Sequence, residues 1–417
     1  MASETVNTPD TQARKVVGPQ VETGLRVGFL ISHPIQYLSP LLRELDSRVD
    51  LHVFYAHDPS PEQQAEAGFD VEFEWDTNLL GGYDYTFLEN KAQDPDARAG
   101  SFFGCDTPGI YGQIRADAFD AFIVNGWYLK SYWQAVWACR RAGVPVFARG
   151  DSQLHVPNQW WKRIAKRIGY PILLRAFDGF LSVGARFDEY LRHYRVPPNR
   201  IHRAPHAVDN SWFASRAKKA EQEGRPRALR DELGLLPDDH ILLFVGKFIS
   251  VKRAEDILRA LDVLETRNVD VSAIYVGAGP QEKALRSKAQ RLGVSAHFVG
   301  FKNQSELPAY YALADALVLP SKSETWGLVV NEAMACGTPA IVSEAVGCRP
   351  DLIVDGETGY GYPMGDVEAL ADVTQQLIAE REQGHDFSAV VTRRIEGYSP
   401  ESATKHIVKA IQSVVSA

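Results

Sequence analysis

Two successive series of short apolar runs, each alternating with amphipathic stretches of helix length, constrain the fold of this 417-residue chain most strongly. Apolar runs of about four to eight residues are typical of buried strands, and intervening helices are typical of parallel sheets. The first series begins at Leu25 and ends near Pro205, and the second begins near His240. A single core would be unusual for a chain of this length. The alternation therefore predicts an α/β fold with two doubly wound domains.

Each predicted strand is a short apolar run bounded by glycine, proline or polar residues. The strands are expected at 25–32, 51–56, 117–125, 144–148 and 179–183 in the first series, and at 240–245, 271–276, 296–299, 315–320 and 338–343 in the second. Residues 58–112 lack this pattern and are rich in Gly, Asp and aromatic residues, among them Trp75. We expect an irregular segment there, either an acceptor-recognition loop or an ordinary packed insertion.

The composition argues against several classes of protein. A formal net charge of −8 disfavours non-specific nucleic-acid binding, so no nucleic-acid partner is expected. No apolar run is long enough to span a membrane. The polar residues 1–24 lack the apolar core of a signal peptide and are expected to form a flexible tail. Widely separated cysteines suggest neither a zinc site nor a disulfide framework, and they favour the reducing cytoplasm; they are Cys105, Cys139, Cys336 and Cys348.

Residues 320–337 place polar side chains between a predicted strand and a predicted helix. The connecting loop is expected at 321–327, and the free N–H groups at the start of the following helix provide an anion site. Glu324 lies in this loop and Glu332 lies in the helix, with seven residues between them. One carboxylate can stand beside a bound anion while the other reaches further along the same ligand. This arrangement predicts a nucleotide sugar, whose diphosphate lies between two hydroxyl-bearing rings.

A family resemblance begins at these glutamates, because the chain from 324 to 339 reads Glu-Thr-Trp-Gly-Leu-Val-Val-Asn-Glu-Ala-Met-Ala-Cys-Gly-Thr-Pro. This stretch resembles the Glu-x7-Glu motif of the retaining GT-B glycosyltransferases of family 4. The resemblance implies that Glu324 contacts donor-sugar hydroxyls and that Glu332 binds the ribose hydroxyls. Members usually carry Pro-Phe where this chain has Thr325 and Trp326. A chance pair on a solvated helix face is the alternative, but the surrounding strand, loop and helix favour the functional interpretation. The phosphate-holding backbone would be that of Trp326, Gly327 and Leu328.

The resemblance covers most of residues 25–417 and implies the GT-B architecture, in which two Rossmann-like domains face a cleft. The expected organisation is a tail (1–24), an acceptor-binding domain (25–205), a linker (206–238), a donor-binding domain (239–398) and a last helix (399–417) that packs back on the first domain. The implied activity is transfer of a hexose-type sugar from a nucleoside-diphosphate sugar to a hydroxyl acceptor in polysaccharide biosynthesis. A glycan, a lipid-linked saccharide and a small molecule all remain open as acceptors.

Two lysines follow the first strand of the second series, where ligands bind in open α/β sheets. The chain reads Gly-Lys-Phe-Ile-Ser-Val-Lys-Arg from 246 to 253, and both Lys247 and Lys252 can reach a common anion. They match the family pattern of a basic residue followed five residues later by Lys. Cleavage of the sugar–diphosphate bond leaves negative charge on the departing phosphate, which preplaced cations stabilise. A solvated helix start is the alternative interpretation, and Arg253 is expected to be a solvated neighbour.

Further donor contacts are implied by the resemblance alone. The turn Gly277-Ala-Gly279-Pro resembles the Gly-x-Gly-Pro turn on the donor side of the family. Phe301 and Lys302 stand where the family grips the base through main-chain groups. Such contacts leave little trace in side chains, so the base stays open, and a UDP-sugar is the donor that we expect. No other cofactor is expected, because the first strand is followed by no Gly-x-Gly-x-x-Gly fingerprint.

Candidate acceptor-side residues follow three strands of the first series. Ser32 and His33 end the first strand, in a loop that the family closes over diphosphate and acceptor, although a structural loop histidine is equally possible. Asn125 and Trp127 follow the third strand, and the indole is a candidate for stacking on a sugar ring. Asp151 stands where many members carry a histidine near the donor sugar. This carboxylate could bind a sugar or acceptor hydroxyl, or it could form a structural salt bridge with Arg149.

No metal is expected in the chemistry. The only Asp-x-Asp sequence, Asp94-Pro-Asp96, lies in a polar loop and is interpreted as a chance match. The lysines and the helix start would replace a divalent cation. Since the pattern contains no dedicated nucleophile, we expect front-face displacement with retention of configuration, in which the leaving phosphate takes the acceptor proton. A GT-B epimerase or hydrolase and a non-catalytic sugar-binding relative are the alternatives.

Residues 159–170 read Gln-Trp-Trp-Lys-Arg-Ile-Ala-Lys-Arg-Ile-Gly-Tyr, which is basic and aromatic at helical spacing. Such a helix can lie on an anionic membrane surface, here the inner face of a membrane. A helix that packs on its domain and exposes a solvated Lys/Arg face has the same pattern. The membrane interpretation would favour a lipid-linked acceptor, and it leaves the protein cytoplasmic but membrane-associated.

Overall fold

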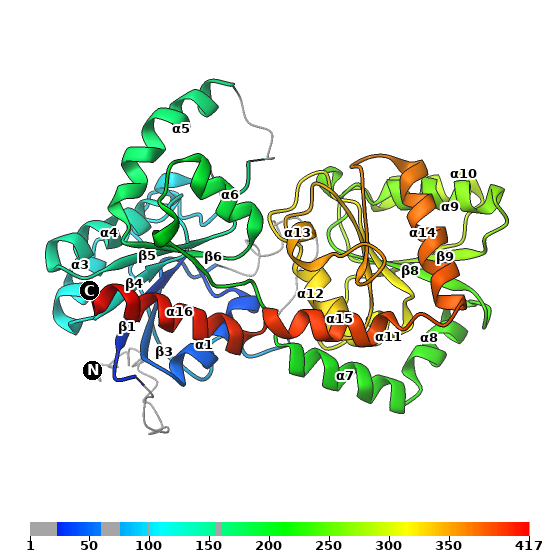
Figure 1. Ribbon diagram of the computed structural model, residues 1–417, viewed down its shortest axis with the longest axis horizontal. Helices are drawn as coiled ribbons and strands as arrows, with labels where there is room; N and C mark the ends of the chain where they lie inside the picture. The colour runs from blue at the N-terminus through cyan, green and yellow to red at the C-terminus, as the bar shows by residue number, and fades with distance from the viewer. Residues whose placement is uncertain (1–22, 60–75, 99, 155–159, 417) are drawn as a thin grey trace, which may run out of the picture.

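The structure, a computed structural model, describes residues 23–59, 76–98, 100–154 and 160–416. They form two α/β domains that lie side by side (Figure 1). The first domain contains a seven-stranded parallel sheet in the order β3-β2-β1-β4-β5-β6-β7. Its strands are β1 (Arg26–Ile31), β2 (Asp50–Tyr55), β3 (Asp84–Phe87), β4 (Ala121–Val124), β5 (Val146–Gly150), β6 (Gly179–Ser182) and β7 (Ile201–Arg203).

The second domain contains a six-stranded parallel sheet in the order β10-β9-β8-β11-β12-β13. Its strands are β8 (His240–Val245), β9 (Val271–Val276), β10 (Ala296–Gly300), β11 (Ala316–Leu319), β12 (Ala340–Ser343) and β13 (Gly359–Tyr362). The central strands are continuously apolar because helices cover both faces of the sheet, so that all of β11 and β12 is buried. The two-domain α/β fold with Rossmann-like sheets is therefore confirmed.

Helices cover both sheets. Those of the first domain are α1 (Ser39–Asp46), α3 (Ile110–Asp117), α4 (Lys130–Ala142), α5 (Trp160–Leu173) and α6 (Ala185–His193). Those of the second are α7 (Asn210–Gln222), α8 (Arg225–Leu233), α9 (Glu255–Thr266), α10 (Glu282–Leu292), α11 (Leu307–Leu313), α12 (Leu328–Ala335), α13 (Arg349–Leu352), α14 (Val367–Glu382) and α15 (Phe387–Ile395). The last helix, α16 (Pro400–Val415), runs back to the first domain (Figure 1), where Ile407 and Ile411 join the core around β1.

The strand orders position the functional loops. In each sheet the order reverses next to the first strand of that domain, between β1 and β4 and between β8 and β11. At such a switch point the loops after the two neighbouring strands diverge to opposite faces and leave a crevice for a ligand. Residues 32–33 and 125–127 follow β1 and β4, and residues 246–252 and 321–327 follow β8 and β11. These two pairs of loops thus lie at the two switch points.

Four segments differ from the sequence-based expectation. Residues 206–238 are largely helical, because α7 and α8 bury Phe213 and Leu229 in the core of the second domain. Within residues 58–112, β3 extends the first sheet beside β2, although its half-buried residues give no apolar run. The short edge strands β7 and β13 also lack such runs. Trp75, most of the predicted tail, and residues 155–159 lie outside the described residues.

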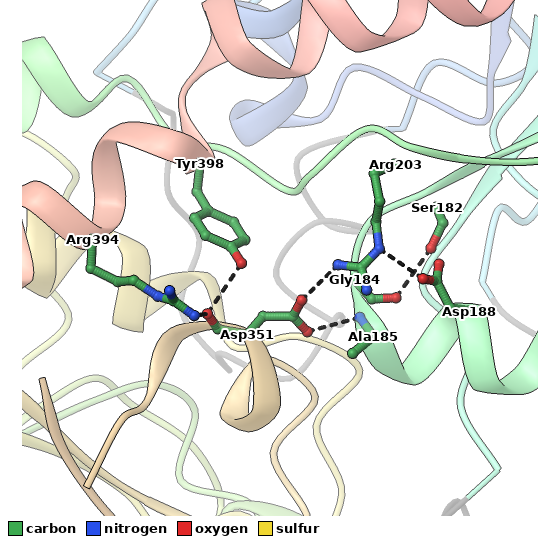
Figure 2. Close-up of polar contacts among 8 residues, drawn as sticks. All are labelled: Ser182, Gly184, Ala185, Asp188, Arg203, Asp351, Arg394 and Tyr398. Carbon is green, nitrogen blue, oxygen red and sulfur yellow. Dashed lines mark hydrogen bonds and ion pairs between the residues drawn. The ribbon is translucent and has the colours of Figure 1, made fainter.

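A buried carboxylate joins the two domains (Figure 2). Asp351, in the short helix α13, accepts a hydrogen bond of 2.8 Å from the backbone N–H of Ala185, the first residue of α6. Its other oxygen lies 2.8 Å from Arg203, which also pairs with Asp188 of α6 at 2.8 Å. Asp351 therefore caps a helix of the opposite domain, where the helix dipole favours negative charge. Its backbone carbonyl accepts hydrogen bonds from Tyr398 and Arg394.

Among the described residues, no helix combines the length and the apolar character that crossing a bilayer requires. The four cysteines are free thiols, and three of them are fully buried.

Candidate active site

The strand ends of the second domain pack closely through glycine. Gly277 follows β9 with a φ of +143°, and a Cβ there would lie 1.9 Å from the carbonyl oxygen of Gly246. Gly279 has a φ of +150° and packs against the backbone of Phe248. Both positions require glycine because backbone meets backbone. The Gly-x-Gly-Pro turn therefore shapes the loop that carries Lys247, and direct contact of Gly277 and Gly279 with a donor stays a prediction.

The loops after β8 and β11 bring the predicted catalytic residues together. The Lys252 ammonium group forms an ion pair with the Glu324 carboxylate, and both side chains are about four-fifths buried. Lys247 lies close enough to this ion pair for the charges of Lys252 and Glu324 to act on its pKa. Burial and the charge of Lys252 lower the pKa of Lys247, while Glu324 partly opposes this effect. Two cations and one carboxylate thus meet at the crevice of the second domain.

The loop 321–327 is held rigidly in front of α12. The carbonyl oxygen of Glu324 accepts the backbone N–H of Gly347 at 2.9 Å, and that of Trp326 accepts the N–H of Cys348 at 2.9 Å. Gly327 has a φ of +101° and a Cβ there would approach Leu319, so the turn into α12 requires glycine. The helix begins at Leu328, and its first N–H groups have no acceptor within the helix. An anion bound there would lie beside the Lys252–Glu324 pair.

The Trp326 side chain is buried between the two domains. Its indole N–H donates to Asn331 at 2.8 Å, and its ring packs against His206 at 5.5 Å between centroids. A Cβ on Gly184 of the first domain would lie 2.2 Å from this ring. The side chain therefore contributes to domain contact, which leaves the backbone of Trp326 as its predicted link to a donor.

Glu332 is buried inside the second domain, in α12. Tyr311 of α11 donates a hydrogen bond of 2.6 Å from its hydroxyl to the Glu332 carboxylate. Burial raises the pKa of Glu332 to about 7, although the Tyr311 hydrogen bond opposes the rise. The Glu332 carboxylate accepts one hydrogen bond, from Tyr311, and burial makes its ionisation costly. It is therefore well suited to accept further hydrogen bonds from hydroxyl groups such as those of a ribose.

A cavity of about 740 Å³ lies on the other side of the crevice. All five acceptor-side residues predicted from the sequence line it: Ser32, His33, Asn125, Trp127 and Asp151. Thr325 of the donor loop also lines it, so the cavity adjoins the donor site. Further lining residues are Ile35, Tyr37, Phe102, Gly126, Tyr128, Arg149, Gly150, Ser152, Gln153, Lys166, Tyr170, Tyr190 and His206.

The histidine after β1 is uncharged at neutral pH. Ser32 Oγ and His33 Nδ1 lie 3.0 Å apart, and burial together with the nearby His57 lowers the pKa of His33 to about 4. A neutral imidazole can donate or accept a hydrogen bond but carries no charge for a phosphate. Trp127 is largely engaged in packing, because its ring stacks on Phe187 at 6.0 Å between centroids. The predicted stacking of Trp127 on a sugar ring could therefore involve only the part of the indole that lines the cavity.

Asp151 is held by a histidine that belongs to the crossing between the domains. His206 Nε2 lies 3.9 Å from Asp151 Oδ2, and His206 Nδ1 lies 3.4 Å from Arg149 Nη2. The imidazole therefore separates Arg149 from Asp151, in place of the direct salt bridge considered above. Burial and the charge of Arg149 lower the pKa of His206 to about 4, although Asp151 opposes this. A neutral ring can accept a hydrogen bond from Arg149 at Nδ1, whereas the 3.9 Å between Nε2 and Asp151 is longer than a direct hydrogen bond.

The charge of Asp151 is favoured by its neighbours. Burial would raise the pKa of this carboxyl group, but hydrogen bonds from His206 and Thr325 and the charge of Arg149 outweigh burial and lower it. Gln153 lies two residues further on and donates a hydrogen bond of 2.8 Å to the carbonyl oxygen of Glu324. The loop after β5 thus meets the donor loop directly. Asp151 is an anion at neutral pH, placed at the junction of donor site and cavity.

Several other predicted residues form separate contacts. Lys302 pairs with Glu306 at 3.3 Å, and Phe301 follows β10 at the edge of the sheet, so a role in base binding stays a prediction for both. Arg253 pairs with Asp256 at 2.6 Å. Asp96 is bound by Arg98 and Ser101 at the surface. Across the described residues, no three or more His, Cys, Asp or Glu side chains gather as a metal site would require.

The sequence alone did not single out four residues of this site. His206 lies in a segment interpreted only as a domain crossing, and Tyr311 and Gln153 carry no motif. Arg149 appeared only as a possible ion-pair partner. The available signals were an arginine within the apolar strand β5 and a histidine shortly after β7, since such residues are rarely buried without a partner.

Two protein families match the chain, one in each domain. Residues 36–212 match the family described as Glycosyltransferase Family 4, and residues 227–393 match the family described as Glycosyl transferases group 1. The first match begins after β1 and the loop at 32–33, and the two matches together span the remaining strands and the loops at 125–127, 246–252 and 321–327.

Several curated relatives are similar to the chain. A D-inositol 3-phosphate glycosyltransferase of Xylanimonas cellulosilytica is 30% identical over 314 residues, which cover 68% of this chain and 72% of the relative. A similarly named protein of Catenulispora acidiphila is 34% identical over 65% of each chain. An N-acetyl-alpha-D-glucosaminyl L-malate synthase of Bacillus anthracis is 33% identical over 37% of this chain, and only 40% of that relative is covered.

Solved structures share the fold at low identity. The Anabaena protein HepE, in complex with UDP and glucose, superposes with a TM-score of 0.67 at 16% identity and covers 93% of this chain and 100% of its own. Sucrose-phosphate synthase of Thermosynechococcus elongatus gives a TM-score of 0.69 at 18% identity, with 94% and 99% coverage. These likenesses establish the two-domain fold.

Proposed function

The chain belongs to glycosyltransferase family 4, and from this premise we propose that it transfers a hexose-type sugar from a nucleoside-diphosphate sugar to a hydroxyl acceptor with retention of configuration. The observation that carries the proposal is the meeting of Lys252, Glu324 and Lys247 beside the start of α12. A diphosphate requires cations and free N–H groups, and a sugar requires a carboxylate within reach of its hydroxyls. All three lie at one crevice here.

The proposed chemistry places charge where this site can stabilise it. The bond between the anomeric carbon and the phosphate oxygen breaks, and negative charge develops on the diphosphate between the lysines and the amide end of α12. The acceptor oxygen attacks the anomeric carbon from the same face and forms the new bond. Its proton passes to the leaving phosphate oxygen, so no separate base is required. Asp151 and Glu324 stabilise positive charge on the sugar ring, and the lysines fulfil the electrostatic role that a divalent cation has in other transferases.

The cavity supports transfer over the alternative of nucleotide-sugar hydrolysis or epimerisation. A hydrolase needs only water, and a space of about 740 Å³ next to the donor loop is large enough for a second organic substrate. The buried Arg149 and the half-buried Lys166 both line it and favour an acceptor that carries an anionic group near its hydroxyl. The relatives named for D-inositol 3-phosphate and L-malate would use acceptors of this kind.

The nucleotide is proposed to be a uridine diphosphate, which the Anabaena structure contains. A thermal-shift comparison of UDP-, GDP- and ADP-sugars tests this, because a ligand that binds only the folded protein raises its melting temperature by mass action. The expected result is stabilisation by UDP-sugars above the others. Stabilisation by none of the three would contradict the proposed donor site. Release of free sugar at the same rate with and without hydroxyl acceptors would favour a hydrolase.

A further inference from the structure

Helix α5 (Trp160–Leu173) turns its apolar side outward. Trp160, Ile164, Ile168 and Ile172 recur every four residues and therefore share one helix face. Their exposed fractions are 73%, 51%, 68% and 69%. An ordinary surface helix directs such a stripe toward the core. In Figure 1, α5 extends from the first domain away from the rest of the molecule, so its outer face is open.

The opposite face of α5 holds the helix on the domain. Tyr170 packs against Tyr194 at 5.0 Å between ring centroids and against Trp127 at 6.3 Å. Lys166 lies over the Tyr170 ring at 5.4 Å, and both residues line the acceptor cavity. Anchoring therefore uses the inner face only. The outer stripe is not needed for packing and remains available to a partner.

The charge around α5 is opposite in sign to that of the whole protein. Residues 152–177 contain no Asp or Glu, although the chain carries a formal net charge of −8. The same stretch contains the basic residues Lys162, Arg163, Lys166, Arg167 and Arg175. Two further apolar side chains, Phe102 and Phe103, are 39% and 73% exposed, and Phe102 lines the same cavity. The apolar stripe thus lies in a locally basic region next to the cavity.

We propose that the outer face of α5, with Ile164, Ile168 and Ile172 at its centre, docks on an anionic lipid bilayer. A helix with an apolar face and basic flanks lies in the interface, where the apolar side chains enter the boundary between headgroups and acyl chains. The exposed side chains of Arg167 and Arg175 are attracted by anionic headgroups. A second copy of this chain fits less well, because a symmetric contact would place two basic helices against each other.

Docking brings the acceptor cavity close to the membrane surface, because the helix that would lie on the membrane also contributes Lys166 and Tyr170 to the cavity wall. If the proposed transferase function holds, its acceptor is then the headgroup of an anionic lipid or lipid-linked saccharide. The docking itself is independent of the transfer chemistry.

Flotation with vesicles tests the docking on the full-length protein. Wild type is expected to bind vesicles of phosphatidylcholine and phosphatidylglycerol, to bind phosphatidylcholine alone weakly, and to lose affinity as salt rises. Replacing both exposed isoleucines, Ile168→Ser with Ile172→Ser, should weaken binding about tenfold or more. The matched control is Leu236→Ser in the second domain, whose side chain is 66% exposed, and it should bind as wild type.

Three results would overturn the proposal. Wild type could fail to bind the anionic vesicles, the double variant could bind them as tightly as wild type, or the double variant could convert a wild-type dimer to a monomer without any change in vesicle binding. Thermal stabilisation by the nucleotide sugar is measured on the same variants and is expected to be unchanged. Absence of that stabilisation in wild type would contradict the transferase proposal alone.

Discussion

Glu332 provides a prediction whose sign and size follow from its burial. The pKa of its carboxyl group is raised to about 7 from the ordinary 4.5, mainly by burial. Between pH 4.5 and about pH 7 the folded protein binds more protons than the unfolded chain. The stability of wild type therefore falls as pH rises through this range and stays reduced above it. At about 1.4 kcal/mol per pKa unit, the ionised carboxylate destabilises the folded protein by roughly 3 kcal/mol above pH 7.

The substitution Glu332→Gln removes this effect and retains the shape of the side chain, and its amide oxygen can still accept from Tyr311. We expect the variant without ligand to melt higher than wild type at pH 8, by on the order of 5–10 °C for a domain of this size, and at nearly the same temperature at pH 5. Circular dichroism melting curves across this range give the difference. The matched control is Glu380→Gln. Glu380 also accepts a hydrogen bond from a tyrosine, Tyr360, at 2.6 Å, but the Glu380 side chain is only half-buried.

The same carboxylate should make nucleotide affinity depend on pH. If ribose hydroxyls donate to Glu332, the bound nucleotide favours the ionised form, so wild-type affinity should rise between pH 6 and pH 8 and the Gln variant should show no such rise. A difference in melting temperature that is constant across pH would refute the reasoning, as would a variant less stable than wild type at pH 8. Either result would mean that Glu332 ionises at little cost in the folded protein.

Three further substitutions test other parts of the structure. Lys252→Ala should lower kcat by roughly 10²–10³, whereas Arg253→Ala, which removes the ion pair with Asp256, should retain most activity in the same steady-state assay. Asp351→Ala removes two charge-assisted hydrogen bonds between the domains and should cost about 2–4 kcal/mol, seen as two separate thermal transitions in calorimetry where wild type shows one. Gly347→Ala places a Cβ 1.9 Å from the Thr325 carbonyl oxygen and should abolish donor stabilisation, while Gly397→Ala, which meets nothing within 4 Å, should not.

The sequence predicted the parts of this protein that local chemistry determines. Strands such as β8 and β11 are buried on both faces, so their apolar runs were visible, and the lysines and glutamates that follow them lie at predictable strand ends. The edge strand β3 was missed because its four half-buried residues are alternately polar and aromatic, which gives no apolar run. The helices α7 and α8 within the linker were not predicted, because each buries few residues, among them Phe213 and Leu229, beneath a charged surface.

Contacts between distant segments were not predictable. His206 approaches Asp151 and Trp326 only because the crossing segment passes between the two domains, and Tyr311 meets Glu332 only because α11 packs near α12. No spacing in the chain encodes either contact. The sequence left open whether Asp151 binds a sugar or acceptor hydroxyl or forms a salt bridge with Arg149, and in the structure the imidazole of His206 lies between Arg149 and the carboxylate.

The central claim is that Lys247, Lys252 and the amide end of α12 hold a diphosphate. Isothermal titration tests it most directly, with the nucleoside diphosphate that stabilises the protein most compared with its monophosphate, on wild type and on the Lys247→Ala and Lys252→Ala variants. The account predicts that wild type binds the diphosphate more tightly and that each variant loses most of this advantage. Variants that retain the full preference for the diphosphate would contradict it.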